Sequence, residues 1–310
     1  MLPEPLRNAL DDEAGAYPAG VLAKAADELS EAYRGGRTFR FGADEHRVAY
    51  ALVRMPATYA VLVRVLSELR DRCPGGAPRS VLDLGSGTGA AAWAAAEVLD
   101  PLDRVTLVEE DRRLIELGQR LGAPAEWRSG DVRVAPLEPH DLVTLSYVLG
   151  EMEEAAAVRV LRRAWNAAAQ ALVVIEPGTP RGFAGVRLWR DELIAMGAHV
   201  AAPCPHCAAC PMPEGDWCHF SRRLERTSLH RKLKHGAVGY EDEKFSYVAV
   251  TRAAAEPAEA RILRHPVRLP GHVKLRLCTI EGLRDEVVRR GQKEAWRAVR
   301  HAAWGDLLQR

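Results

Sequence analysis

The stretch Arg79-Ser-Val-Leu-Asp-Leu-Gly-Ser-Gly-Thr-Gly89 decides the fold of this chain. Its apolar part, Val81–Leu84, is interrupted only by Asp83, which is typical of a buried parallel strand. An alanine-rich segment, residues 90–99, follows as a predicted helix. Between strand and helix lie three glycines, where bare backbone can approach a ligand near the helix N-terminus: Gly85, Gly87 and Gly89.

Acidic residues follow the next two predicted strands. The strand Val105–Val108 leads into Glu109-Glu110-Asp111, about 20 residues beyond the glycines, where dinucleotide-binding folds hold a ribose diol. A third strand, ending at Trp127, is followed by Asp131 in a loop, where a carboxylate suits an adenine amino group. A glycine loop alone does not separate these ligand classes, so the acids refine the prediction.

The combination of D-L-G-S-G-T-G, V-E-E-D and S-G-D resembles the class I S-adenosylmethionine-dependent methyltransferases. The resemblance implies that Asp83 and the glycines border the methionine part of the donor, that Glu109 binds the ribose hydroxyls and that Asp131 faces adenine. The alternatives are an NAD-binding unit and a fold that has lost its ligand, and three matches in order favour the methyltransferase. The candidate cofactor-binding residues are Asp83, Gly85, Ser86, Gly87, Gly89, Glu109, Asp131 and Ser146.

Strands and helices continue to alternate after this unit, which predicts an α/β, doubly wound sheet of the class I methyltransferase (Rossmann-like) type. Further strands are predicted at 141–147 and 171–175, and a late strand, Phe245–Thr251, is expected to close the sheet. Carboxyl ends of parallel strands face the ligand crevice. Three residues at these ends are therefore expected to line it: Ser146, Tyr147 and Glu176.

Residues 1–75 carry apolar positions at helical spacing, and Pro56 is expected to begin a new helix there. A breaker cluster, Cys73-Pro-Gly-Gly-Ala-Pro78, then separates the helices from the first strand. We expect three domains: an N-terminal helical domain (1–76), a methyltransferase domain (77–255) with a Cys-rich metal-binding insertion at about 203–240, and a small basic β/α module (256–310).

The composition is that of an ordinary globular protein, with 47% hydrophobic and 27% charged residues in a chain of 310. The sequence has no run of about 18 apolar residues and no charged-then-apolar leader. These features predict neither a membrane span nor secretion. We therefore expect a cytoplasmic protein that does not contact a membrane.

Four of the six cysteines lie in one proline-rich stretch, Pro203–Phe220. Clustered thiols in a reducing compartment indicate a metal site rather than disulfides. Thiolate-rich sites suit zinc or iron–sulfur, and spacing alone does not decide between them. His206 and His219 are alternative ligands in a mixed zinc site. A single cysteine is more often a small buried hydrophobe, which we expect of Cys73.

The C-terminal third is basic, because residues 204–310 contain 20 Lys and Arg against 13 Asp and Glu. A basic helix is expected over 221–235, and a helical stretch is expected from Glu281. This charge fits an RNA phosphate backbone, and a solvated mixed-charge face is the alternative. Trp296 and Trp304 are compatible with RNA stacking, although core packing is the commoner role of such tryptophans.

Over most of its length the chain resembles the methyltransferase-like protein 17 family of mitochondrial small-ribosomal-subunit proteins and their bacterial relatives. The matching motifs occur in a fixed order and are R-M-P-A-T-Y (54–59), L-D-L-G-S-G-T-G (82–89), L-S-Y-V-L-G-E-M (145–152), C-P-H-x-x-x-C-P (204–211), W-C-H-F (217–220), Y-E-D-E-K-F-S-Y (240–247) and L-P-G-H-V…L-C-T (269–279). The resemblance implies a class I methyltransferase fold, association with the small ribosomal subunit during its assembly, and a four-cysteine [4Fe-4S] site. Carried over by motif, the cluster ligands are Cys204, Cys210, Cys218 and Cys278, and Cys207 has no place in the pattern.

The leading hypothesis is a protein that binds S-adenosylmethionine and acts on the small ribosomal subunit and its 16S-type rRNA, with no DNA partner. A non-catalytic assembly factor that binds rRNA is the first alternative, and a small-molecule methyltransferase with structural zinc is the second. Catalytic residues are not identified, because Ser146-Tyr147 stands where amino-methylating enzymes carry an Asp/Asn-Pro-Pro-Tyr element. Methyl transfer needs little beyond holding donor and acceptor in line, so this absence does not exclude it.

Overall fold

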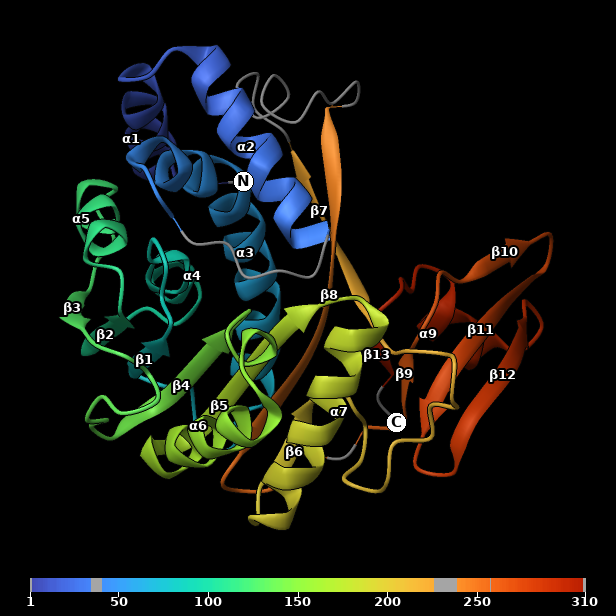
Figure 1. The fold of residues 1–310 in the computed structure, drawn as a ribbon. Helices are drawn as coiled ribbons and strands as arrows, with labels where there is room; N and C mark the ends of the chain where they lie inside the picture. Colours follow the sequence, from blue (N-terminus) through green and yellow to red (C-terminus); the bar gives the residue numbers. More distant parts are fainter. Residues whose placement is uncertain (1, 35–40, 226–238, 257, 309–310) are drawn as a thin grey trace.

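Strands and helices alternate through the middle of the chain and build one twisted sheet with helices on both faces (Figure 1). The computed structural model describes residues 2–34, 41–225, 239–256 and 258–308. A second, smaller sheet forms a C-terminal lobe beside this body, at the right of Figure 1.

The predicted strands form the parallel part of the main sheet. They are β1 (Ser80–Leu84), β2 (Arg104–Glu109), β3 (Glu126–Ser129), β4 (His140–Ser146) and β5 (Ala168–Pro177). The strand order is β3-β2-β1-β4-β5-β8-β6, so the direction in which the sheet grows reverses between β1 and β4. Doubly wound sheets bind ligands outside the carboxyl ends of the strands at such a switch point. The order confirms the predicted class I methyltransferase type of sheet.

The late strand, β8 (Tyr240–Thr251), is antiparallel and lies between β5 and β6 (His199–Ala202). The expectation that this strand closes the sheet is therefore wrong, because β6 lies beyond it. Its first half extends past β6 and pairs with β7 (Phe220–Glu225). The prediction of a basic helix is wrong for residues 221–225, because the ladder with β8 takes their backbone hydrogen bonds; the remainder of that segment lies outside the described residues.

Four helices connect the strands: α4 (Ala90–Val98), α5 (Arg112–Arg120), α6 (Glu154–Ala167) and α7 (Pro180–Ala195). The first two pack on one face of the sheet, and the other two pack on the opposite face. Asp111 caps α5 by accepting hydrogen bonds from the Arg113 and Leu114 amides, as expected of an acidic N-cap. A short 3-10 turn, η1 (Leu149–Glu151), follows β4.

Three helices precede the sheet: α1 (Glu4–Gly15), α2 (Ala19–Arg34) and α3 (Asp44–Arg72). α3 continues through Pro56, so the prediction of a new helix there is wrong. An internal proline costs about 3 kcal/mol, which the buried residues on both sides of it outweigh. α3 is long and apolar enough to cross a membrane, but 61% of its most apolar window is buried within this fold. It shares one apolar core with the sheet, and the three-domain division stays a prediction.

The C-terminal lobe has its own sheet and apolar cluster. Its elements are β9 (Ala260–Ile262), β10 (Val267–Leu269), β11 (His272–Thr279), β12 (Gly282–Arg289), α9 (Lys293–Val299) and β13 (Leu307–Leu308). The prediction of a helix from Glu281 is wrong for its first part, residues 282–289, which form a strand. A tight turn brings the chain back at Gly282, whose φ of +121° suits glycine, and residues 282–289 pair with β11.

A buried ion pair joins the lobe to the main body. Arg261 of β9 is 1% exposed, and its Nη2 donates to Glu68 of α3. Its Nε donates to the Pro203 carbonyl at 2.6 Å, and its Nη1 donates to the Gly305 carbonyl at 2.7 Å. Tyr247 of β8 donates its hydroxyl to the other Glu68 oxygen at 2.9 Å. Because each charge has several partners, its burial is tolerated.

Replacing Glu68 tests this junction. Glu68→Ala leaves Arg261 buried without its carboxylate, so we expect the free energy of unfolding in urea to fall by about 3–5 kcal/mol. The matched control is Asp103→Ala, which removes an ion pair between two exposed side chains, Arg79 and Asp103, and should change stability little. If the free energy of unfolding falls equally in the two variants, the buried ion pair contributes no more than the exposed one, which would contradict this prediction.

Candidate functional site

The glycine loop after β1 has a left-handed backbone and close neighbours at two positions. Gly85 has a φ of +74°, and a Cβ there would meet Val148 Cγ2 at 2.5 Å. Gly87 has a φ of +54°, and its Cβ would lie 3.3 Å from the Tyr50 hydroxyl. The Gly85 amide donates to the Val108 carbonyl at 2.9 Å, which ties the loop to the end of β2. The loop therefore depends on glycine for both backbone conformation and space.

Glu109 lies buried at the end of β2, beside this loop. Its Oε2 accepts a hydrogen bond from the Gly87 amide at 2.8 Å, and its Oε1 accepts one from the Asp111 amide at 3.0 Å. Burial raises its pKa, and these amide bonds oppose the rise. A carboxylate oxygen accepts more than one hydrogen bond, so both oxygens keep capacity for ligand hydroxyls.

The Asp83 side chain is buried against the neighbouring strand, β4. It is 3% exposed, and its Oδ1 accepts a hydrogen bond from Thr144 Oγ1 at 2.5 Å. Burial raises its pKa to about 6. Ser86 donates its hydroxyl to the Asp83 carbonyl at 3.0 Å, and this hydrogen bond ties the glycine loop to the end of β1.

At the carboxyl end of β4, two buried hydroxyls have no hydrogen-bond partner among the described residues: Ser146 Oγ and Tyr147 Oη. Tyr147 also has a φ of +62°, a conformation that non-glycine residues rarely adopt. Buried polar atoms are normally paired, so these two are candidates to meet a ligand. Ser146 was predicted on this edge, and the structure places it there.

Glu176 and Asp131 occupy different environments. Glu176, at the end of β5, is 3% exposed, and its Oε1 accepts a hydrogen bond from the Gly150 amide at 3.0 Å. Burial raises its pKa to about 7. Asp131 is partly exposed, and its carboxylate is paired with Arg133 at 2.7 Å, which lowers its pKa. Asp131 would have to release that partner to meet an adenine.

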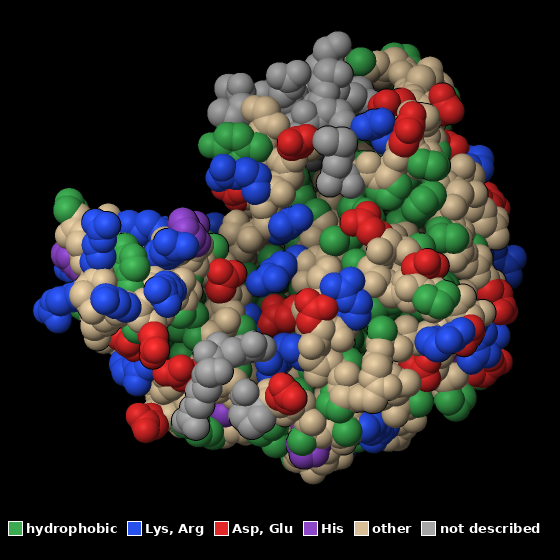
Figure 2. Space-filling model, turned by 180° about the vertical axis from the view of Figure 1, so that it is seen from behind, with side chains coloured by type: hydrophobic (Ala, Val, Ile, Leu, Met, Phe, Trp, Pro, Cys, Tyr) green, Lys and Arg blue, Asp and Glu red, His purple; other side chains and the backbone are tan. Residues whose placement is uncertain are grey.

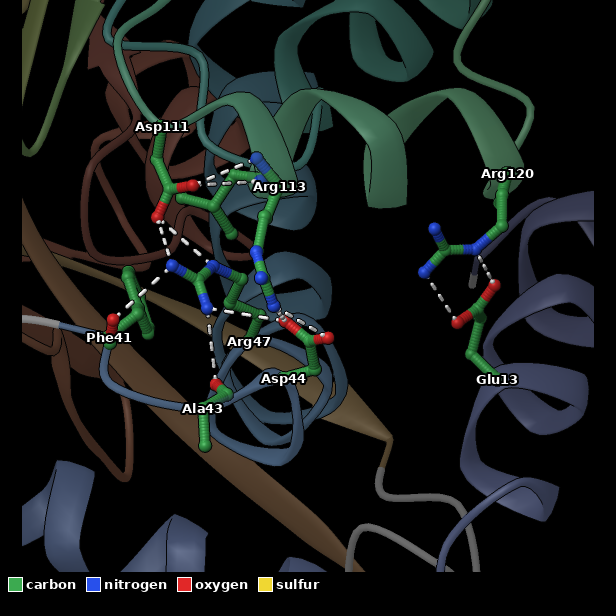
Figure 3. A network of polar contacts seen from close by, with 9 residues as sticks. Glu13, Phe41, Ala43, Asp44, Arg47, Asp111, Arg113 and Arg120 are labelled. Atoms are coloured by element: carbon green, nitrogen blue, oxygen red, sulfur yellow. Dashed lines mark hydrogen bonds and ion pairs between the residues drawn. The ribbon is translucent and has the colours of Figure 1, made fainter.

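α3 contributes residues to this region that were not predicted. Arg47 donates from Nε and Nη2 to Asp111 Oδ2 at 3.0 and 2.8 Å (Figure 3). Arg54 lies over the Tyr147 ring, 5.3 Å from its centroid. Arg47, Tyr50 and Arg54 recur at helical spacing and therefore share one face of α3. This spacing is the sequence signal from which they could have been predicted.

A separate apolar cavity lies beside α7, the Cys-rich segment and the lobe. Cys278 reaches it from β11, although the other three cysteines come from the segment that follows β6. The structure thus brings together the four cysteines that the motif resemblance groups. The thiols lining the cavity are Cys204, Cys210, Cys218 and Cys278.

Two buried guanidinium groups, Arg190 and Arg261, line the same cavity. Burial raises the pKa of Cys278 to about 12, and the nearby arginines oppose the rise. Arg190 also holds the Cys-rich segment, because its Nη2 donates to the His206 and Ala208 carbonyls at 3.0 and 2.7 Å. Metal ligation requires thiolates, whose negative charge these guanidinium groups would offset.

Cys207 differs from the other cysteines of its segment. It is exposed, and its Sγ accepts a hydrogen bond from the Val200 amide at 3.3 Å, away from the cavity.

Within the described ranges, no three His, Cys, Asp or Glu side chains are placed to hold one metal ion. His206 Nε2 lies 3.7 Å from Cys278 Sγ. Cys73 is buried, as expected of a small hydrophobe.

Comparison with known proteins gives relatives across most of the chain. Human mitochondrial ribosome assembly protein METTL17 is 29% identical over 290 residues, which cover 84% of this chain and 62% of the human protein. Rsm22-cox11 tandem protein 2, mitochondrial, of Schizosaccharomyces pombe is 26% identical over 331 residues, covering 86% of this chain and 43% of that protein. The chain therefore spans less than two thirds of each of these relatives.

Among solved structures, the plantazolicin methyltransferase in complex with SAH aligns with a TM-score of 0.46 and 10% identity, covering 80% of this chain and 99% of that chain. Magnesium protoporphyrin IX methyltransferase from Synechocystis PCC 6803 aligns with a TM-score of 0.39 and 11% identity, covering 70% and 86%.

The expectation of a cytoplasmic protein is wrong. The human and Schizosaccharomyces pombe relatives are described as mitochondrial proteins, and so is the matching family. Absence of a recognisable leader in the sequence was the basis for that expectation, and it does not report the compartment.

The family model described as mitochondrial small ribosomal subunit Rsm22 matches residues 44–309, from the start of α3 to beyond β13. The match includes both the glycine loop and the four cysteines of the cavity. The chain belongs to the Rsm22 family of mitochondrial small-ribosomal-subunit proteins.

Proposed function

We propose that this protein binds S-adenosylmethionine and acts on the small ribosomal subunit, through rRNA methylation or through assembly of the subunit. The family match over residues 44–309 carries the proposal, because one continuous match includes the glycine loop, the cysteines and the basic lobe. The relatives' descriptions, a small-ribosomal-subunit protein and a ribosome assembly protein, support the ribosomal role.

The crevice residues fit S-adenosylmethionine. The unpartnered Ser146 and Tyr147 hydroxyls offer hydrogen bonds, and Glu109 keeps acceptor capacity for a ribose diol. Gly85 and Gly87 let the ligand approach the backbone. The donor supplies an electrophilic methyl group when bound, and the protein's part is to hold and orient it.

We propose Glu176 as the proton acceptor for methyl transfer. Its pKa, raised to about 7 by burial, matches what a proton acceptor needs near neutral pH. It lies at the carboxyl end of β5, on the edge where Tyr147 follows β4. A small-molecule methyltransferase with structural zinc leaves the basic lobe without a role.

We propose that Cys204, Cys210, Cys218 and Cys278, which line one cavity, hold a [4Fe-4S] cluster. Four thiols in an apolar pocket, with two buried guanidinium groups beside them, provide the ligands and offset their charge. Zinc remains the alternative, since the same donors bind it. Ligands from both β11 and the Cys-rich segment would make the metal a cross-link between lobe and body.

The lobe provides a surface for rRNA. Lys, Arg and His side chains gather on the lobe that projects from the body, at the left of Figure 2. Several of its basic residues are exposed and have no carboxylate partner among the residues described: Lys274, Arg289, Arg290, Lys293, Arg297 and Arg300. Unpaired surface cations bind phosphates by releasing counterions.

Titration calorimetry on the purified protein tests the donor site. We expect S-adenosylmethionine to bind and NAD not to bind. Glu109→Ala should weaken binding by roughly 10- to 100-fold, because hydrogen bonds to a charged group are lost. Binding of NAD without S-adenosylmethionine would contradict the ligand assignment.

Anaerobic purification with iron, sulfide and zinc analysis tests the metal site. Cys278→Ser should lose iron and the brown chromophore, because it removes the ligand from β11. Cys207→Ser is the control from the same segment and should retain both. Stoichiometric zinc without sulfide would refute the cluster, and a colourless Cys207→Ser protein would refute the ligand set.

Charge reversal on the lobe tests the RNA surface. Arg289→Glu/Arg290→Glu/Arg297→Glu should weaken binding to small-subunit rRNA fragments, and the salt dependence should fall by about one unit of slope per lost phosphate contact. Arg79→Glu/Arg104→Glu/Arg162→Glu makes the same change in net charge at ion-paired positions on the body. Equal effects of the two triple variants would show that net charge, and not this surface, governs binding.

A further inference from the structure

Arg47 is a buried cation whose partners lie in a different part of the chain. It belongs to the first turns of α3 and is only 8% exposed. Two of its guanidinium nitrogens donate to one oxygen of Asp111, at 3.0 and 2.8 Å (Figure 3). Its other contacts among the described residues are with the Phe41 ring and carbonyl, the Ala43 carbonyl and Asp44, at the start of α3 or just before it. Within the described residues, Asp111 is therefore its partner from a distant part of the chain.

Asp111 uses its other atoms to fix the turn between β2 and α5. Its second oxygen, Oδ1, accepts hydrogen bonds from the Arg113 amide at 2.9 Å and the Leu114 amide at 3.4 Å. Its own amide donates to Glu109 Oε1 at 3.0 Å. The side chain thus anchors the helix, while the backbone holds the carboxylate of Glu109.

A continuous set of hydrogen bonds therefore runs from α3 to the glycine loop. Arg47 holds Asp111, the Asp111 amide holds Glu109, and Glu109 accepts a hydrogen bond from the Gly87 amide at 2.8 Å. Every member lies at the edge of the proposed donor site. A shift of Asp111 would move one of the backbone groups that fix the Glu109 carboxylate.

The other ion pairs between α5 and the N-terminal helices are more exposed. Arg113 pairs with Asp44 at 2.9 Å, and Arg120 pairs with Glu13 at 2.6 Å (Figure 3). The arginines in these pairs have side chains 61% and 55% exposed, against 10% for Arg47. Exposed pairs contribute little, whereas a buried guanidinium with a paired carboxylate holds a defined position.

We infer that Arg47 is a positioning residue for the ribose end of the donor site, acting through Asp111 on Glu109. The inference rests on the proposed binding of S-adenosylmethionine and adds that the N-terminal helices set the geometry of that site. In this inference Arg47 acts through Asp111 and not by direct contact with the ligand. Its effect should therefore be confined to the part of the ligand that Glu109 binds.

A ligand-side comparison tests this. Calorimetry would measure S-adenosylhomocysteine and its 2′-deoxyribose analogue against the wild-type protein and three variants. For the wild type, removal of the ribose hydroxyl should cost roughly tenfold or more in affinity. In Arg47→Ala, affinity for S-adenosylhomocysteine should fall by roughly tenfold, and the penalty for the missing hydroxyl should shrink to about twofold, since Glu109 is no longer fixed. Arg47→Lys keeps the charge and should give an intermediate loss.

Arg120→Ala is the matched control, because it removes an ion pair to the same N-terminal helices at the other end of α5. It should keep the wild-type affinity and the full penalty for the analogue. An Arg47→Ala protein that loses affinity for both ligands equally would show a merely structural role and overturn the inference. A wild-type protein that binds neither ligand would overturn the proposed function and the inference with it.

Discussion

The ion pair between Arg261 and Glu68 is the contact on which the arrangement of the chain depends. It joins a strand of the C-terminal lobe to α3. Tyr247 of β8 also donates a hydrogen bond to Glu68, which attaches β8 to the same junction. A buried guanidinium is stable only where its partners are, so β9 has to meet α3 at this position. The same side chain binds the Pro203 carbonyl, at the start of the Cys-rich segment. Cys278 is carried to the thiol cavity by a strand that pairs with β9.

α3 links the two candidate sites. Arg47, near its beginning, contacts the turn beside the proposed donor site, and Glu68, near its end, contacts the junction beside the thiol cavity. At a rise of 1.5 Å per residue, these two positions lie roughly 30 Å apart along the helix. The two candidate sites therefore share a rigid element without sharing residues. Loss of the proposed metal should accordingly loosen the lobe more than the proposed donor site.

The features that follow from local sequence were predicted correctly. The glycine loop and the parallel strands depend on periodicity and on glycine chemistry, which neighbouring residues reveal. Errors arose where distant partners decide the structure. Residues 221–225 form a strand because β8 lies beside them, and α3 passes through Pro56 because its faces are buried on both sides.

The site shows the same division. The positions of Glu109 and Ser146 follow from the ends of strands, so the sequence predicts them. Arg47 was missed, because its role depends on a partner 64 residues away. The four cysteines were grouped by motif, since their spacing does not show that β11 returns to the Cys-rich segment.

A crystal structure of the anaerobically purified protein with S-adenosylhomocysteine, with diffraction recorded at the iron and zinc absorption edges, tests the two-site account most directly. We expect the ribose against Glu109, the adenine toward Asp131, and an anomalous iron signal in the cavity lined by the four thiols. Zinc in that cavity, or a nucleoside bound away from the glycine loop, would contradict it.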